Sequence, residues 1–400
     1  MNQPQGGVAA PLGHAPGGEP IYLDNHATTP VDLRVADVVL RHMTAGFGNA
    51  SSAGHLVGER AGAAVDVARR QVAALVGGEP TQVIFTSGAT EALNLAIVGF
   101  VWQRRRERPG ARVRIALPPT EHHAVLDTCM GLESEGAAEL LWLPVDQRGR
   151  LDLDALEAMC TDGTDLMCVM AANNEVGTIH PVEVVCRIAA GTGTPVVCDA
   201  TQAAGKIPLD AGRWGVAMLA FAAHKMYGPQ GVGALIVRGD VRLAPLLRGG
   251  GHQGGLRPGT LNVPGIAGFG EACRLRRLEM GKDEPRVARL RDQLQQDLAQ
   301  RIPDLVVNGD LEQRLAGNLH VSVTGVPNTA VQALLRPYVA LSTSSACSSG
   351  ALGPSHVLRA LGLSEPVMEG ALRLGLGKFT TEEEIGRAAE HIARAVAIVR

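Results

Sequence analysis

Seven short apolar segments, separated by amphipathic stretches, constrain the fold of this chain more than any other feature. They are VIFT (83–86), VRIAL (113–117), ELLWLPV (139–145), LMCVMA (166–171), VVCDA (196–200), VAMLAF (216–221) and VGALIV (232–237). Each is apolar on both faces, which is typical of a strand covered on both sides. Helical patterns lie between several of them, for example at residues 90–106 and 181–190. This alternation predicts an α/β domain with a mostly parallel, seven-stranded sheet.

The pattern changes after about residue 280. A charged helical stretch from Val287 to Arg301 precedes two alternating strands, NLHVSV (318–323) and ALRLGL (371–376). The last helix begins at a capping pattern in which Thr381 precedes Glu384 by three residues. The second part of the chain therefore predicts a smaller α+β domain.

The composition is that of a globular protein in a reducing compartment. Apolar residues make up 46% of the 400 residues and charged residues 19%, and the net charge of −3 does not favour a polyanion-binding protein. The seven cysteines include no C-x-x-C pair and no zinc-site spacing, so we expect buried thiols and no resident metal. No stretch is apolar enough to span a membrane, and residues 1–19 lack the features of a targeting signal. We expect a cytoplasmic protein whose first 19 residues form a disordered tail.

Polar motifs follow three of the predicted strands, at the sheet edge where open α/β proteins bind ligands. In FTSGATEALN (85–94), free N–H groups and the Thr90 hydroxyl suit a phosphate, although such a turn also simply begins a helix. Asp199 could hold a protonated pyridine nitrogen or cap the next helix. Lys225 could be a Schiff-base amine or a lysine that reaches solvent. Phosphate, pyridine nitrogen and aldehyde are the functional groups of pyridoxal phosphate, so the conjunction favours this cofactor.

Nine motifs follow one another from about residue 21 to the end of the chain. They are YLDNHATTP (22–30), FTSGATEALN (85–94), TEHHAVLDT (120–128), NNEVGTIHPV (173–182), CDATQAAGK (198–206), HKMYGPQGVGAL (224–235), RPGTLNVPG (257–265), SACSSGALGPSHVLRALGL (345–363) and LRLGLGKFTTEEEI (372–385). This set resembles the cysteine desulfurases of the NifS/IscS-like branch, which are aminotransferase-like, fold-type I pyridoxal phosphate enzymes. The resemblance implies a large cofactor-binding domain over residues 34–279. A small domain would combine residues 20–33 with residues 280–400 and carry the loop of the catalytic cysteine.

The resemblance assigns roles to residues around the cofactor ring. Lys225 would bind the cofactor covalently and then move the Cα proton of the substrate. Asp199 would keep the pyridine nitrogen protonated. Gln202 and Asn174 would reach the ring hydroxyl, and Asn174 would also contact the substrate. His122 would stack on the ring and help to move protons.

Other roles implied by the resemblance concern the phosphate, the partner subunit and the substrate. Ala89, Thr90 and His224 would bind the phosphate. Thr260 would do so from the partner subunit, so a homodimer is implied. Arg373 would pair with the substrate carboxylate, although a lone arginine in an alternating strand is otherwise a surface charge.

A single cysteine, Cys347, lies in the polar stretch STSSACSSGALGPSH (342–356). The resemblance implies that its thiolate takes the sulfur of L-cysteine, which leaves alanine and a persulfide on Cys347. Small flanking residues would let the thiol reach both the cofactor and an acceptor. The acceptor could belong to iron–sulfur assembly, nucleic-acid thiolation or a sulfur metabolite, and a transient metal cluster at Cys347 stays open. The alternative is a surface cysteine without a role.

Three features depart from the family pattern. Ala222 and Ala223 stand where the family usually has Ser-Gly, so one phosphate-binding hydroxyl is missing. His26 stands where a small residue is common, and it could donate a proton or narrow the entrance, of which we favour the second. The chain ends at Arg400, without the longer tail by which some iron–sulfur assembly members hold their scaffold.

Alternatives to the favoured function follow from the same residues. A selenocysteine or cysteine sulfinate lyase would use the same lysine without Cys347, and a non-catalytic subunit of a sulfur system would bind the cofactor poorly. The basic run at residues 104–108, with Arg112 and Arg114, could contact tRNA or DNA. We favour a solvated helix end for this run and do not expect direct nucleic-acid binding.

Overall fold

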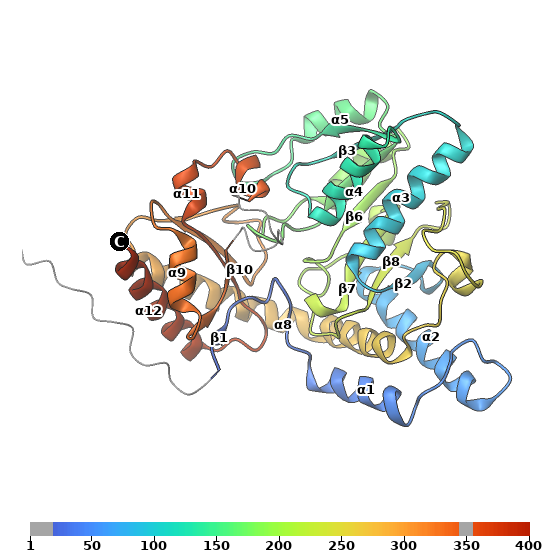
Figure 1. Ribbon diagram of the computed structural model, residues 1–400, viewed down its shortest axis with the longest axis horizontal. Coiled ribbons are helices and arrows are strands. Elements are labelled where there is room, and N and C mark those ends of the chain that lie inside the picture. Colours follow the sequence, from blue (N-terminus) through green and yellow to red (C-terminus); the bar gives the residue numbers. More distant parts are fainter. Residues whose placement is uncertain (1–18, 344–354) are drawn as a thin grey trace, which may run out of the picture.

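All seven predicted strands form and join in one sheet. In a computed structural model, which describes residues 19–343 and 355–400, the strand order is β2-β8-β7-β6-β5-β3-β4 (Figure 1). The strands are β2 (Val83–Thr86), β3 (Val113–Leu117), β4 (Ala138–Trp142), β5 (Leu166–Met170), β6 (Val196–Asp199), β7 (Met218–Ala222) and β8 (Gly233–Val237). Only β8 runs against its two neighbours. The predicted α/β class with a mostly parallel sheet is confirmed.

Helices cover both faces of this sheet, as continuous apolar strands require. One face packs against α3 (Ala89–Glu107) and α4 (His123–Ser134). The other packs against α2 (Leu56–Val76), α5 (Leu153–Thr161), α6 (Val182–Ala190) and the first part of α8 (Val263–Arg301).

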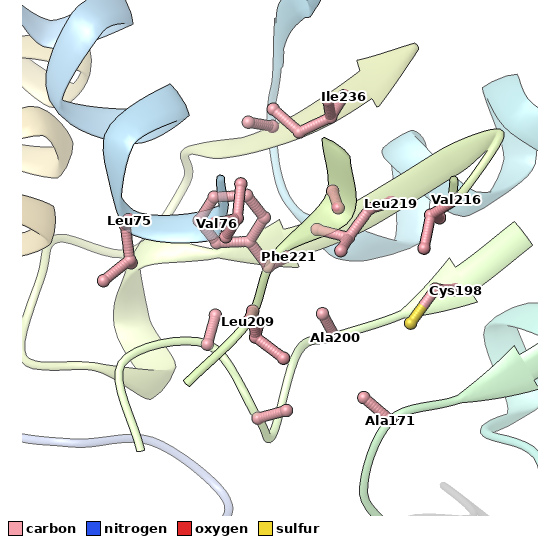
Figure 2. Close-up of a cluster of buried hydrophobic side chains, with 14 of the residues drawn as sticks. Leu75, Val76, Ala171, Cys198, Ala200, Leu209, Val216, Leu219, Phe221 and Ile236 are labelled. Carbon is pink, nitrogen blue, oxygen red and sulfur yellow. The ribbon is translucent and has the colours of Figure 1, made fainter. Parts of the chain in front are cut away.

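Successive residues of a strand point to opposite faces, and β7 illustrates this rule. Met218 and Ala220 join the cluster under α3, whereas Leu219 and Phe221 join the cluster on the opposite face. Figure 2 shows Leu219 and Phe221 in this second cluster, with the Phe221 ring next to Val76 of α2. Both clusters consist of buried apolar side chains. Polar side chains that could bind a ligand therefore lie at the ends of the strands.

Helix α8 is much longer than the sequence predicts. The charged pattern predicts a start at Val287, but the helix begins at Val263 and keeps Pro285 in its interior. An interior proline costs about 3 kcal/mol because it lacks an N–H donor and crowds the preceding turn. Packing against α1 (Leu33–Thr44) and α2 at one end and α12 (Glu382–Val399) at the other outweighs this cost. Because α8 crosses residue 280 unbroken, the domain boundary there stays a prediction.

The C-terminal part contains a four-stranded antiparallel sheet in the order β12-β13-β10-β9. Its elements are β9 (Leu305–Val307), β10 (Asn318–Val323), α9 (Asn328–Leu335), β12 (Ser342–Thr343), α10 (His356–Ala360), α11 (Glu365–Glu369), β13 (Ala371–Gly375) and α12. The predicted capping box is present, since Thr381 Oγ1 accepts from the Glu384 N–H and Glu384 Oε2 accepts from the Thr381 N–H.

The N-terminal segment is bound to this C-terminal part. Strand β1 (Ile21–Tyr22) pairs in parallel with β11 (Val339–Ala340), and Asp24 forms a bridge with Gly375. This pairing brings residues from the two ends of the sequence to one place. The remaining elements are η1 (Pro80–Gln82), α7 (Ala211–Trp214), η2 (Ala223–Lys225) and η3 (His252–Gly255).

Several predictions concern features outside the sheets. Six cysteines are buried, free thiols, whereas Cys347 and residues 1–18 lie outside the described residues. Arg104, Arg105 and Arg106 occupy the last turn of α3, as predicted for a helix end. Within the described ranges, none of the helices combines the length and apolarity that a membrane crossing requires. The same ranges hold no group of three or more His, Cys, Asp or Glu side chains that could bind a metal.

Candidate active site

A cavity of about 540 Å³ lies at the carboxyl ends of the parallel strands. Residues that follow β2, β3, β5, β6 and β7 line one side of it. Residues 26–28, from the N-terminal segment, and Arg373, from β13, line the other. The predicted site residues that the structure brings together here are Ala89, Thr90, His122, Asn174, Asp199, Gln202, His224, Lys225 and Arg373.

Two predicted site residues are not in this group. Thr260 lies on the exposed surface and does not line the cavity. Cys347 lies outside the described residues. Ala222 and Ala223, which stand where the family usually has Ser-Gly, are buried and also do not line the cavity.

The turn between β2 and α3 forms one end of the cavity. A Cβ added to Gly88 would meet nothing within 4 Å, so the backbone here is open to the cavity. A Cβ on Gly233 of β8 would lie 2.7 Å from the carbonyl carbon of Gly88, so glycine allows β8 to pass directly against the turn. The N-terminus of α3 therefore faces the cavity with free N–H groups, beside the Thr90 side chain. This end suits a phosphate.

The Lys225 amine lies between the two sides of the cavity. Its Nζ donates to the carbonyl oxygens of His26 at 2.6 Å and Ala27 at 2.7 Å. The residue before it, His224, contacts Thr28 Oγ1 through Nδ1 at 3.2 Å. Burial lowers the pKa of His224 to about 4, with the nearby Lys225 charge acting in the same direction, so its ring is neutral at pH 7.

Asp199 and His122 both line the cavity. Asp199 is 6% exposed, and its Oδ1 accepts from the Thr201 N–H at 2.9 Å. His122 caps α4, and its Nδ1 accepts from the Ala124 N–H at 3.0 Å. Burial lowers the pKa of His122, although the Asp199 charge opposes this shift. The neutral ring therefore carries its proton on Nε2.

Gln202 belongs to a network that the sequence analysis missed. Its Nε2 donates to the His26 carbonyl oxygen at 2.8 Å, and its Oε1 accepts from Lys206 Nζ at 2.8 Å. Burial lowers the pKa of Lys206 to about 7. The only sequence signal for Lys206 was its place in the CDATQAAGK motif.

Arg373 is held by two partners from different parts of the chain. The guanidinium is 3% exposed, and it donates to Asp24 Oδ1 and to the Asn174 carbonyl oxygen, each at 3.1 Å. Such an arginine is fixed in place and still has N–H groups for a planar carboxylate. Asp24 was quoted in a motif but was not assigned a role.

These groups fit pyridoxal phosphate. The open turn at α3 offers donors for a phosphate, Lys225 offers a primary amine for an aldehyde, and Asp199 offers a buried carboxylate for a pyridinium nitrogen. Arg373 lies on the opposite side, where it can hold a carboxylate.

Comparison with known proteins gives the same assignment. The model of the aminotransferase class-V family matches residues 21–387. The chain is 46% identical over 381 residues to cysteine desulfurase IscS of Anaeromyxobacter sp. (strain Fw109-5), which covers 94% of this chain and 91% of that protein. A NifS-like protein of known structure superposes with a TM-score of 0.87 at 36% identity, covering 95% of this chain and all of the other. SspA in complex with cysteine superposes with a TM-score of 0.76 at 30% identity, covering 90% and 99%.

The predicted family and cofactor are thus confirmed, while the roles of the individual residues stay predictions. The chain belongs to the aminotransferase class-V family of pyridoxal phosphate-dependent enzymes.

Proposed function

We propose that this enzyme is an L-cysteine desulfurase, which transfers the sulfur of L-cysteine to Cys347 and releases L-alanine. The observation that carries the proposal is one cavity that joins the cofactor-binding groups to a buried arginine suited to an amino-acid carboxylate. The relatives support it, because the IscS protein is named a cysteine desulfurase and SspA was solved with cysteine.

Different residues of the cavity bind the phosphate, the pyridine nitrogen and the substrate carboxylate. The α3 N-terminus with Ala89, Thr90 and His224 holds the phosphate, and Asp199 holds the pyridine nitrogen in its protonated form. When bound, pyridoxal phosphate withdraws electrons from the bonds around the substrate's α-carbon. Arg373 holds the substrate carboxylate.

Two groups handle protons. Lys225 Nζ donates to the carbonyl oxygens of His26 and Ala27, which hold it beside the N-terminal segment. From this position Lys225 takes the Cα proton of the substrate and later returns a proton. His122 presents the N–H of Nε2 to the cavity, because its Nδ1 is occupied by the Ala124 N–H.

The sulfur step involves Cys347. Its thiolate attacks the sulfur of L-cysteine, so that an S–S bond forms while the Cβ–S bond breaks, and the electron pair of that bond remains with carbon. A proton added at Cβ completes L-alanine, and the second sulfur stays on Cys347 as a persulfide. An acceptor in iron–sulfur assembly, nucleic-acid thiolation or sulfur metabolism then removes it.

The proposed enzyme is a homodimer. Leu33, Leu40 and Met43 of α1 and the nearby Phe47 and Leu56 are large apolar side chains, each at least 60% exposed. A second copy of the chain would cover this apolar surface. The exposed Thr260 would then serve the phosphate of the partner's site.

The compartment also belongs to the proposal. Six buried, unpaired cysteines suit the reducing conditions of the cytoplasm.

The test uses the purified holoenzyme without reductant. After recording the visible band of the lysine-bound cofactor, L-cysteine is added, alanine is assayed, and the peptide carrying Cys347 is weighed. We expect alanine and a mass gain of one sulfur atom on Cys347 in equal amounts. Alanine with an unmodified Cys347 would instead identify a lyase, and a protein that stays colourless with added cofactor would identify a non-catalytic subunit. The Cys347→Ser variant should keep the visible band and lose alanine formation.

A further inference from the structure

The Gln202 amide is held in one orientation by three contacts. Gln202 lines the cavity and is 4% exposed. Its Nε2 donates to the His26 carbonyl oxygen at 2.8 Å. Its Oε1 accepts from Lys206 Nζ at 2.8 Å and lies 3.0 Å from His26 Nδ1. A carbonyl oxygen can only accept and an ammonium group can only donate, so these partners determine which end of the amide is nitrogen and which is oxygen.

The same contacts determine where His26 carries its proton. Because Gln202 Oε1 can only accept, His26 Nδ1 must be the donor. Burial lowers the pKa of His26 well below its usual value, and the nearby Lys206 and Arg373 charges add to this effect, so the ring holds one proton. That proton is bound to Gln202 and is not donated to a ligand, contrary to one of the two roles considered from the sequence.

The oxygen of the Gln202 amide is fully used, whereas its nitrogen is not. An amide oxygen has two lone pairs, and Lys206 and His26 occupy both. The amide nitrogen has two N–H groups, and the described part of the chain supplies an acceptor for one of them. Gln202 can therefore offer a ligand in the cavity a donor and not an acceptor. The best partner for such a donor is an oxyanion.

Lys206 is positioned to serve Gln202. Within residues 19–343 and 355–400, its Nζ has one hydrogen-bond partner, which is Gln202 Oε1. Glu284 of α8 favours the charged form of Lys206, but the carboxylate of Glu284 is already bound by Arg276 at 2.7 Å. Arg276 is 1% exposed and also donates to the Gly205 carbonyl oxygen at 2.8 Å, which fixes the backbone next to Lys206.

We propose that Lys206 is a positioning residue that acts through Gln202 on the ring oxygen of the bound cofactor. Its ammonium group fixes and polarises the amide, so that the second N–H of Gln202 donates more strongly to the ring oxygen in its deprotonated form. The inference rests on the proposed function and on the predicted contact of Gln202 with the ring hydroxyl. It adds a residue that does not touch the cofactor.

The visible band of the lysine-bound cofactor reports the state of this oxygen. The proton between the ring oxygen and the Lys225 nitrogen is lost at lower pH when a hydrogen bond or a positive charge stabilises the oxyanion. The other charges that act on Lys206 belong to Lys225, Arg276, Arg373 and Glu284, and the variants below leave all four in place.

The test is a pH titration of the visible band of the holoenzyme without substrate. Lys206→Met removes both the donor and the charge, so we expect the midpoint to rise by about one pH unit, as for the loss of a nearby charge in a partly buried site. Lys206→Arg keeps both and should stay closer to the wild type. Lys282 of α8 is exposed, so Lys282→Met is the matched control and should leave the midpoint unchanged.

A double substitution tests whether Lys206 acts through Gln202. We expect Gln202→Leu alone to raise the midpoint, because it removes the donor to the ring oxygen. Lys206→Met added to Gln202→Leu should then raise it by much less than one pH unit. A full additional rise would show that Lys206 acts without Gln202 and would overturn the inference.

An unchanged midpoint in Lys206→Met, with a lowered melting temperature, would show a purely structural role and also overturn the inference. Lys206→Gln keeps an N–H for Gln202 Oε1 without the charge, so it should raise the midpoint less than Lys206→Met does. If Lys206→Met does not fold, Lys206→Gln decides the question, and an unchanged midpoint in it counts against the inference equally. These titrations contain no L-cysteine, so a wild type that binds the cofactor and does not convert L-cysteine would overturn the proposed function alone.

Discussion

The two sides of the cavity are built in different ways. We call Thr90, His122, Asp199 and Lys225 the strand-end side, because each lies at or shortly after the end of a strand of one sheet. His26 and Arg373 form the terminal side. There the ion pair between Asp24 and Arg373 joins residues 349 positions apart in the sequence. The strand-end side is set by the order of a single sheet, whereas the terminal side exists only when the N-terminal segment pairs with β11 and β13.

The two sides also hold their histidines in different protonation patterns, as His122 and His26 show. On the strand-end side, His122 Nδ1 accepts from a backbone N–H, so Nε2 is a donor. On the terminal side, His26 Nδ1 donates to Gln202, so Nε2 is an acceptor. The same side chain thus takes opposite tautomers within one cavity, because the first partner of each ring differs.

Lys225 joins the two sides, so its replacement should have the largest effect. We expect Lys225→Ala to lose the visible band of the lysine-bound cofactor and to lower turnover by about 10⁴-fold or more, since acid–base catalysis alone contributes about 10²–10⁴. Absorbance and alanine release measure the two effects. Lys225→Arg keeps donors for the carbonyl oxygens of His26 and Ala27 and should be equally inactive but fold normally. Substantial turnover in either variant would contradict the proposed role.

Replacing Arg373 changes only the terminal side of the cavity and so tests its role in substrate binding. We expect Arg373→Ala to raise KM for L-cysteine about 10- to 100-fold, as for a lost charged hydrogen bond, and to keep the visible band. Steady-state kinetics with an absorbance check provide the measurement. Asp24→Asn is the matched control, since it removes the ion-pair partner and leaves the guanidinium in place. If Asp24→Asn raised KM as much, Arg373 would be a structural residue.

The same difference explains what the sequence could predict. The strand-end side was accessible because buried strands are visible as apolar runs, and parallel strands bring the residues that follow them to one edge. Arg373 could be placed only through the family resemblance. The contact of His26 with Gln202 was not predicted, since a contact across 176 residues leaves no local pattern. Only the charged part of helix α8 was predicted, because its first part is held by packing against other helices that no local pattern shows.

Gly233 tests whether the strand-end side binds the phosphate. A Cβ there would meet the backbone of Gly88 at 2.7 Å and the Phe221 carbonyl oxygen at 2.8 Å, and neither can move as a side chain can. We expect Gly233→Ala to displace the turn and weaken cofactor binding about tenfold, which corresponds to overpacking of about 1–3 kcal/mol. Titration of the apoenzyme with pyridoxal phosphate measures this affinity.

Gly239, just beyond β8, has nothing within 4 Å of an added Cβ, so Gly239→Ala should bind the cofactor normally. Equal affinities in the two variants would exclude the turn from the phosphate site.

The last prediction concerns stability and not activity, at a contact between the segment after β5 and α10. Glu175 is 4% exposed, and its Oε2 accepts from Ser355 Oγ at 2.6 Å. Burial raises the pKa of Glu175 from its usual value of 4.5 to about 7, although the Ser355 hydrogen bond and the Arg373 charge oppose this shift. The folded protein therefore keeps a proton that the unfolded chain loses above pH 4.5.

The sign of the resulting pH dependence follows from this difference in bound protons. Below pH 4.5 both states are protonated and Glu175 has no effect on the free energy of unfolding. As the pH rises from 4.5 to 7, Glu175 lowers that free energy by a total of about 3 kcal/mol, and above pH 7 its effect is constant.

The side chain in Glu175→Gln cannot ionise, so the stability of this variant relative to the wild type should increase between pH 5 and 7 and then level off. Urea unfolding at several pH values measures this difference. Ser355→Ala removes the hydroxyl that stabilises the carboxylate, so it should raise the pKa of Glu175 further and extend the decline of stability to higher pH. A difference between wild type and Glu175→Gln that did not change with pH would mean that Glu175 is ionised in the folded protein, and that this contact tolerates a buried charge.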